Sequence, residues 1–190
     1  MTYAAGSYTV VAIGHNCTGS AIITSSDKVT FPNNKVTDTF SYFGRITVTG
    51  DRQDVNIKMK RVVAMIRLHL TDDVSRMDDV AQFKFYYIGG SSTFSPSAGY
   101  GCVNSKQTEY RTYSDDGVYC LYTLPHAAND VLTKMTVTAL DASDNALGEI
   151  IIENVPVTTD CTGNVRDGSG SVTATITVDT DWAGINNYTY

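Results

Sequence analysis

The chain has 190 residues, and its 25 Thr, 19 Val and 12 Tyr favour β-strands over helices. Its net charge of −6 and the lack of a dense Lys and Arg cluster argue against binding to nucleic acid or to an anionic membrane surface. No run of 18 apolar residues is present, so the sequence contains no transmembrane helix.

In the first third of the chain, short apolar runs alternate with turn residues, and each run predicts a strand. These predicted strands cover residues 8–13, 21–24, 28–31 and 45–49, and clusters of Gly, Asn, Asp and Pro separate them. The last run, RITVT, alternates between apolar and polar residues, as expected of a strand with one buried face.

Between residues 55 and 70 the apolar residues change from odd to even positions. The odd set is Val55, Ile57 and Met59, and the even set is Val62, Ala64, Ile66, Leu68 and Leu70. Such a change reverses the buried face, through either a β-bulge or a passage between two cores. We favour the second explanation and predict a domain boundary near Lys60. Residues 1–60 would form the C-terminal portion of a first β-sandwich domain, and residues 61–190 a complete second one.

Beyond this boundary the same pattern continues to the end of the chain. Strands are predicted over residues 83–88, 118–124, 134–141, 147–155 and 171–179, and residues 142–146 form a hairpin loop. Residues 89–117, rich in Ser, Tyr and Gly, form a long connection, and loops of this length are usually functional or mobile. The overall prediction is an all-β, antiparallel β-sandwich.

The long connection carries three tyrosines, Tyr100, Tyr110 and Tyr113, that suit a recognition surface. Ordinary packing of the loop is the alternative. Near the end of the chain, Trp182 either covers an edge of the sandwich or stacks on a sugar.

The four cysteines have no CxxC spacing, and with only three histidines a structural zinc site is disfavoured. Cys102 and Cys120 flank the polar segment, so a disulfide between them would stabilise that segment in an oxidising compartment. Buried free thiols are the alternative.

No motif for catalysis is present in the sequence. The histidines are scattered, and neither a GxSxG nor an HExxH motif occurs. On an extended chain Asp179 and Asp181 project the same way, as a glycosidase pair would, but aspartates also commonly end strands. We therefore predict no catalytic residue, no cofactor and no metal.

Three segments resemble a known family. Residues 5–12 (AGSYTVVA), residues 55–66 (VNIKMKRVVAMI) and the tail are similar to Bacteroidetes fimbrillins and FimB-type fimbrial anchors. In the tail the most specific element is the Asp-Trp-x-Gly ending formed by Asp181, Trp182 and Gly184. The three segments occur in the family's order and span most of the chain.

This resemblance implies two transthyretin-like domains and a non-enzymatic role in adhesion. It further implies export as a lipoprotein to the outer membrane and the cell surface, and incorporation into or anchoring of a fimbrium. The partners would be other fimbrial subunits, joined by strand addition, and a receptor on a host or bacterial surface. A carbohydrate-binding module is the alternative function, followed by a glycoside hydrolase. Because no lipobox cysteine or signal peptide precedes Thr2, we expect native sequence upstream of Met1.

Overall fold

The computed structural model describes residues 4–49, 55–70, 79–128, 130–157, 162–167, 175–176 and 188–189. Within these ranges the chain is almost entirely strand, with one 3₁₀ turn (Pro32–Asn34) and no α-helix. The all-β prediction is therefore confirmed. No helix in the described ranges is long and apolar enough to cross a membrane. In chain order the strands are β1 (Gly6–His15), β2 (Ile22–Ser25), β3 (Lys28–Thr30), β4 (Thr39–Val48), β5 (Lys60–Arg61), β6 (Ala64–Leu70), β7 (Gln82–Ser91), β8 (Thr93–Ser95), β9 (Tyr100–Gly101), β10 (Asn104–Thr112), β11 (Val118–Thr123), β12 (Asp130–Leu140), β13 (Ala146–Val157), β14 (Thr162–Asp167), β15 (Thr175–Ile176) and β16 (Tyr188–Thr189).

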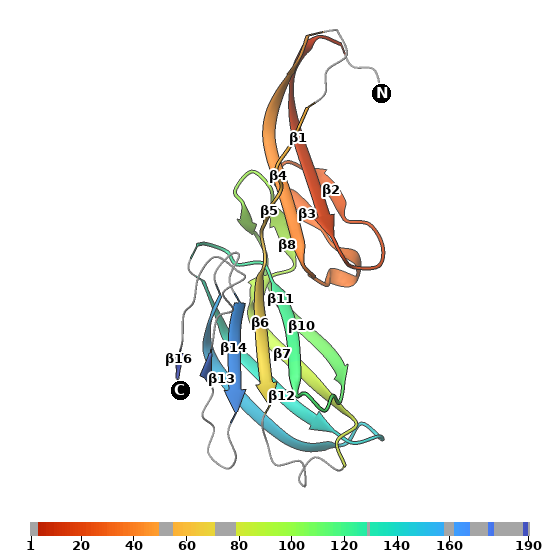
Figure 1. The fold of residues 1–190 in the computed structure, drawn as a ribbon, viewed down its shortest axis with the longest axis vertical. Helices are drawn as coiled ribbons and strands as arrows, with labels where there is room; N and C mark the ends of the chain where they lie inside the picture. Colours follow the sequence, from red (N-terminus) through yellow and green to blue (C-terminus); the bar gives the residue numbers. More distant parts are fainter. Residues whose placement is uncertain are drawn as a thin grey trace.

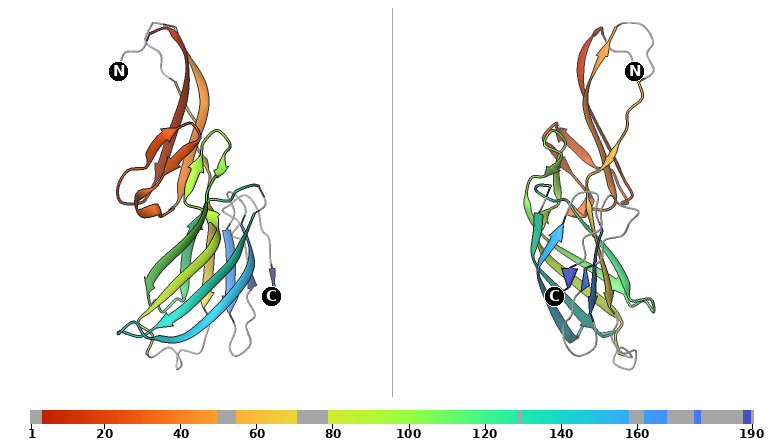
Figure 2. Two further views of the ribbon diagram at one scale, coloured as in Figure 1. Left: turned by 180° about the vertical axis from the view of Figure 1, so that it is seen from behind. Right: turned by 60° about the vertical axis from the view of Figure 1, so that its left-hand side comes forward.

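The molecule is elongated and has two lobes (Figure 1). The upper lobe contains β1 to β5 with β8 and β9, and the lower lobe contains β6, β7 and β10 to β14. Two further views show the same division, with β1 and β4 projecting from the upper lobe as a two-stranded ribbon (Figure 2).

The lower lobe is a sandwich of two sheets, with strand orders β10-β7-β12-β13 and β11-β6-β14. Alternate side chains of β6 and β7 enter its core, namely Ile66 and Leu68 from β6 and Phe83, Phe85 and Tyr87 from β7. Neighbouring strands are antiparallel except for β14, which runs parallel to β6. The predicted antiparallel pairing is therefore correct for most of the lobe.

The upper lobe also has two sheets, with orders β1-β4-β5 and β2-β3-β8-β9. Its smaller core lies near the lower lobe and contains Val29, Phe31, Val36, Val62, Val63, Phe94 and Leu124. Strand β8 follows β7 in the chain but pairs with β3 of the upper lobe, and β9 pairs with β8. The upper lobe thus takes strands from both sides of Lys60, and the boundary at that residue stays a prediction.

Within β6 the predicted even face is the buried one, because Ala64, Ile66 and Leu68 are almost fully covered. The odd set before it forms no strand; Val55 and Ile57 are exposed on an unpaired segment. The hairpin predicted at 142–146 is confirmed, since β12 pairs with β13 around this turn and Asp141 accepts the Asn145 backbone N–H at 2.8 Å.

The prediction of one long loop over residues 89–117 is wrong. This stretch contains the end of β7 and strands β8, β9 and β10. Strand β10 reads NSKQTEYRT, and its inward positions are polar, so no apolar alternation marks it. Most of the strand predicted at 171–179 lies outside the described residues.

Candidate assembly surface

The ribbon of β1 and β4 has two open edges within the described residues. The two strands pair along their whole length, from Gly6 opposite Val48 to His15 opposite Thr39. Strand β5 covers the other side of β4 only at Phe40 and Ser41. Unpaired N–H and C=O groups of this kind are a template for another strand.

One face of the ribbon is apolar but only half-buried. Its even positions include Tyr8, Val10, Ile46 and Val48, all partly exposed, whereas the odd positions at the same level are polar and exposed. The core of the upper lobe lies at the base of the ribbon, where Ile13 packs against it. The projecting end of the ribbon therefore lacks a second layer in the described structure.

Strand β1 differs in charge from the edge strand of the lower lobe. Its ten residues, GSYTVVAIGH, contain no Asp, Glu, Lys or Arg. Edge strand β10 contains Lys106, Glu109 and Arg111. Charged residues, above all those that point inward, are the usual protection of an edge against association. By this criterion β10 is protected and β1 is not.

The inward charge on β10 is Glu109, whose side chain is only 6% exposed and forms an ion pair with Arg111. The buried hydroxyl of Tyr87 lies 3.0 Å from Glu109 Oε1 and 3.2 Å from the carbonyl oxygen of Tyr122. Burial raises the pKa of Tyr87 well above its ordinary value, and the negative charge of Glu109 raises it further. The phenol therefore stays protonated and donates a hydrogen bond to these acceptors.

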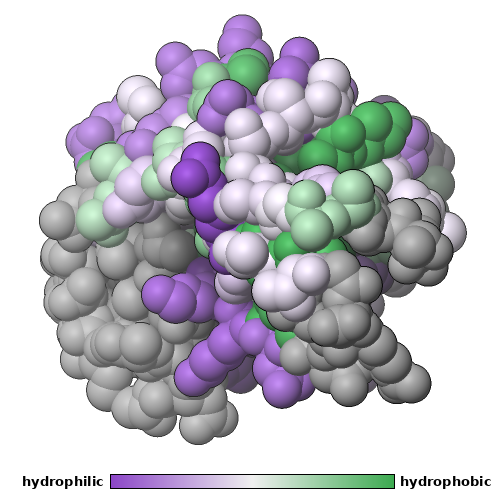
Figure 3. Space-filling view, turned by 90° about the horizontal axis from the view of Figure 1, so that it is seen from above, coloured by the Kyte–Doolittle hydropathy of each residue, from purple (hydrophilic) through white to green (hydrophobic). Residues whose placement is uncertain are grey.

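Apolar side chains are also exposed near the second sheet of the upper lobe. Strand β2 is an edge strand, and its Ile22 is 65% exposed, with Ile23 beside it also exposed. Figure 3 looks down on this end of the molecule and shows apolar surface next to strongly polar surface. Exposed apolar surface that is rimmed by polar residues often marks an interaction site.

A pocket of about 440 Å³ lies between β4 and β5 on one side and the β8–β9 hairpin on the other. Its lining includes Phe43, Lys60, Phe94 and Tyr100. Lys60 forms no ion pair with any described residue, whereas the neighbouring Arg61 binds Asp38 through two hydrogen bonds of 2.7 and 3.0 Å. The pocket thus has several apolar side chains and two cations in its lining, and of these cations Lys60 has no ion-pair partner among the described residues.

The three tyrosines predicted to form a recognition loop lie on different elements. Tyr100 is in β9 and lines the pocket, and Tyr110 is in β10 and 52% exposed. Tyr113 packs against the lower core, with its ring 6.4 Å from that of Phe83. Sequence reasoning thus found one residue of the pocket but missed Phe43, although the aromatic run Phe40-Ser41-Tyr42-Phe43 is itself typical of a strand.

The disulfide predicted between Cys102 and Cys120 is not formed, and both thiols are free. The reason is their position: Cys102 follows β9 in the upper lobe, where its Sγ lies 3.6 Å from the carbonyl oxygen of Thr93. Cys120 lies in β11 of the lower lobe, opposite Arg67. Burial raises the pKa of the Cys120 thiol, which disfavours its reactive thiolate form.

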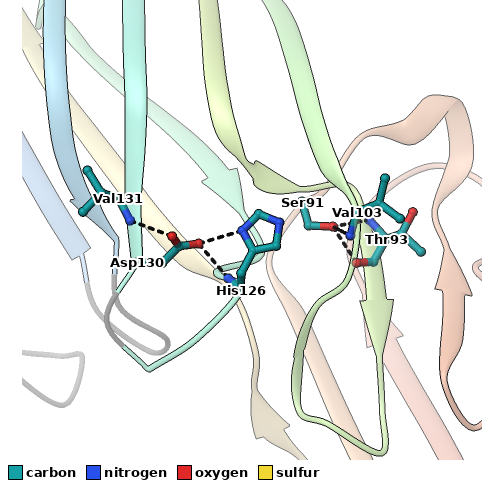
Figure 4. Close-up of polar contacts among 6 residues, drawn as sticks. All are labelled: Ser91, Thr93, Val103, His126, Asp130 and Val131. Atoms are coloured by element: carbon teal, nitrogen blue, oxygen red, sulfur yellow. Dashed lines mark hydrogen bonds and ion pairs between the residues drawn. The ribbon is translucent and has the colours of Figure 1, made fainter.

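His126 and Asp130 form an acid–base pair at the turn before β12 (Figure 4). The imidazole Nδ1 is 2.8 Å from Asp130 Oδ2, and the backbone N–H groups of His126 and Val131 donate to the same carboxylate. Burial raises the pKa of Asp130, but these hydrogen bonds outweigh it and hold the pKa below its ordinary value. The pair closes the turn, which is a structural role.

Among the residues that the structure describes, no nucleophile joins this pair. The hydroxyl of the nearby Ser91 donates to the Thr93 carbonyl at 2.7 Å and accepts the Val103 N–H at 3.1 Å, so it points toward those residues (Figure 4). The Nε2 atom of His126 is buried and has no hydrogen-bond partner among the described atoms. Ser91 and His126 therefore do not form the nucleophile–base contact of a hydrolase.

The other predicted residues of the tail, Asp179, Asp181, Trp182 and Gly184, lie outside the described residues. In the described ranges no group of three or more His, Cys, Asp or Glu side chains is arranged to hold a metal.

Known proteins resemble the chain in sequence and in fold. The family model described as fimbrillin-A associated anchor proteins Mfa1 and Mfa2 matches residues 1–188. The crystal structure of a candidate adhesin from Bacteroides ovatus has a TM-score of 0.54 at 14% identity, over 80% of this chain and 66% of that one. A candidate cell adhesion protein from the same species has a TM-score of 0.49 at 11% identity, over 98% of this chain and 69% of that one. No curated protein matches the chain. Because the family match covers nearly the whole sequence, the chain belongs to the family of fimbrillin-A associated anchor proteins Mfa1 and Mfa2.

Proposed function

We propose that this chain joins other fimbrial subunits at the bacterial surface by strand addition on the open edges of the β1–β4 ribbon. The observation that carries the proposal is the ten-residue strand β1, which is uncharged and pairs only with β4 among the described residues. An extended segment of a partner would satisfy its free backbone groups and gain affinity from main-chain hydrogen bonds.

Family membership supports a role in fimbrial anchoring and adhesion, outside the cytoplasm. We extend this to attachment of the full-length protein to the outer membrane through a lipid, and to a transthyretin-like arrangement of its sandwiches. The role is structural, in keeping with the engaged hydroxyl of Ser91 and the dispersed tyrosines.

The two edges of the ribbon can be blocked separately. The Val62 N–H donates to the Thr39 carbonyl, so the odd residues of β4 direct their backbone groups toward β5. The even residues of β4 then bond to β1, and the odd residues of β1 point their N–H groups outward. Thr9→Pro would therefore remove a donor from the β1 edge, and Thr47→Pro one from the β4 edge, without breaking the β1–β4 ladder.

The test is co-assembly of the full chain with purified fimbrial subunits, followed by light scattering and electrophoresis of the undenatured products. Loss of assembly in either proline variant, with a native circular dichroism spectrum, identifies the edge in use. Undiminished assembly in the double variant would show that subunits join without strand addition.

A further inference from the structure

The edge of β4 opposite β1 has a pocket beneath it. Strand β5 pairs with β4 as Ser41 opposite Lys60 and Phe40 opposite Arg61, and then ends. The odd residues of β4 beyond this point, from Phe43 to Thr47, present their N–H and C=O groups to the open edge. Phe43 also lines the pocket and is 43% exposed although it shares the inward face of Ser41.

The chain's own residues 55–59 lead directly into β5 and are the nearest segment that could fill this edge. Continued from Ser41 opposite Lys60, the register would place Ile57 opposite Gly44 and Val55 opposite Ile46. Val55 and Ile57 would then extend the half-buried apolar face of the ribbon. The structure nevertheless leaves them unpaired, 51% and 39% exposed.

Lys58 would oppose this pairing. In the same register it lies opposite Phe43, so its side chain would face the pocket. There the ammonium group would lose water beside apolar side chains, with Lys60 next to it on the same face. Like charges and desolvation would both disfavour the pairing, which is consistent with the open β4 edge.

We propose that the β4 edge above this pocket is the slot for an extended strand of another fimbrial subunit, one that carries an apolar side chain opposite Phe43. This inference rests on the proposed function and specifies which edge of the ribbon is used. The chemistry of the occupant follows from the lining: Phe43, Phe94 and Tyr100 offer apolar contacts, and a partner without a cation at this position avoids the repulsion that excludes Lys58.

Two peptides test the slot directly. Each copies residues 53–59, one with the native lysine and one with leucine at the position of Lys58, and binding to the full chain is measured by fluorescence anisotropy. Burial of a leucine side chain predicts that the leucine peptide binds at least about tenfold more tightly. The variant Phe43→Ser should remove most of this difference.

The complementary test asks whether residues 55–59 pair with the β4 edge once Lys58 is replaced. The variant Lys58→Leu should increase the hydrogen-exchange protection of the amides of Phe43, Arg45 and Thr47, and should lower affinity for the leucine peptide by about tenfold. The matched control is Asn56→Leu, which adds the same side chain opposite Arg45, away from the pocket lining. It should change neither quantity.

Equal affinity for the two peptides, or unchanged exchange in Lys58→Leu, would overturn the assignment of the slot. Co-assembly that Thr9→Pro abolishes and Thr47→Pro leaves intact would also overturn it, while the proposed function stands. Absence of any co-assembly by the unmodified chain would instead overturn the proposed function.

Discussion

Phe94 offers the sharpest test of the two-lobe organisation. It lies in β8, is 1% exposed, and packs in the upper core although its strand follows β7 of the lower lobe. Replacement by alanine removes a buried aromatic ring, which costs about 3–5 kcal/mol in folded cores. Among the described residues the upper core has seven buried apolar side chains and the lower core fifteen, so we expect the upper lobe to be the less stable of the two.

The consequence is local unfolding. At about 0.05–0.15 kcal/mol per residue, a lobe of a few tens of residues has only a few kcal/mol of stability, comparable with the loss. In Phe94→Ala we therefore expect the amides of β1 and β4 to exchange nearly as in an unfolded chain, while those of β7 and β12 stay protected. Hydrogen exchange with mass spectrometry measures both sets in one experiment.

The matched control is Phe85→Ala, which empties a fully buried site in the lower core. It should weaken protection in β7 and β12. If Phe94→Ala instead lowers protection equally in both lobes, the chain unfolds as one cooperative unit and the division into lobes has no energetic meaning.

Three further predictions follow from single sites. Tyr87→Phe deletes a buried hydrogen-bond donor to a carboxylate and should lower the free energy of unfolding in urea by about 1–3 kcal/mol, whereas Tyr110→Phe, at an exposed ring, should change it by less than about 0.5 kcal/mol. Because the pKa of Asp130 is lowered in the folded protein, its carboxylate contributes fully to stability above the unfolded pKa of about 4. This contribution is lost as the pH falls through the lower folded pKa. Asp130→Asn should therefore lower the free energy of unfolding at pH 7 and make it fall less steeply as the solution is acidified. In the native protein Cys102 should react with a thiol reagent faster than Cys120, because Cys102 is exposed and burial raises the pKa of Cys120. If neither thiol reacts until a reductant is added, the two cysteines form a disulfide in solution and this prediction is wrong.

The strands that could be predicted from sequence are those whose inward positions are apolar. Strand β7 reads QFKFYYIGGS, and Phe83, Phe85 and Tyr87 repeat with the period of a half-buried strand. Strand β10 escaped prediction because its inward positions are Gln107 and Glu109. Local pattern cannot identify a strand whose buried side chains are polar, since Tyr87, which donates a hydrogen bond to the buried Glu109, is 22 residues away in the sequence.

The candidate site was harder to predict, for a different physical reason. Open edges and pockets depend on which strands pair, and this is decided between distant segments: β3 pairs with β8, and β4 with β5. Near Lys60, Val63 is buried in the upper core and Ile66 in the lower one, while the domain boundary read from the parity change stays a prediction. It could not show that residues 55–59 would be left unpaired beside the β4 edge.

The proposed strand addition would link folding of the ribbon to assembly of the fimbrium. A two-stranded sheet is marginally stable in water, and the end of the ribbon has one half-buried face and no third strand among the described residues. A partner strand bound at a hundred times its dissociation constant would add about 2.7 kcal/mol to the folded form. That is a large share of the stability of a small lobe, and the lower lobe gains nothing from it directly. Under this proposal, addition of a strand would order the ribbon as it joins the subunits. The unpaired backbone groups of the ribbon edge would then make the stability of the upper lobe depend on the partner strand.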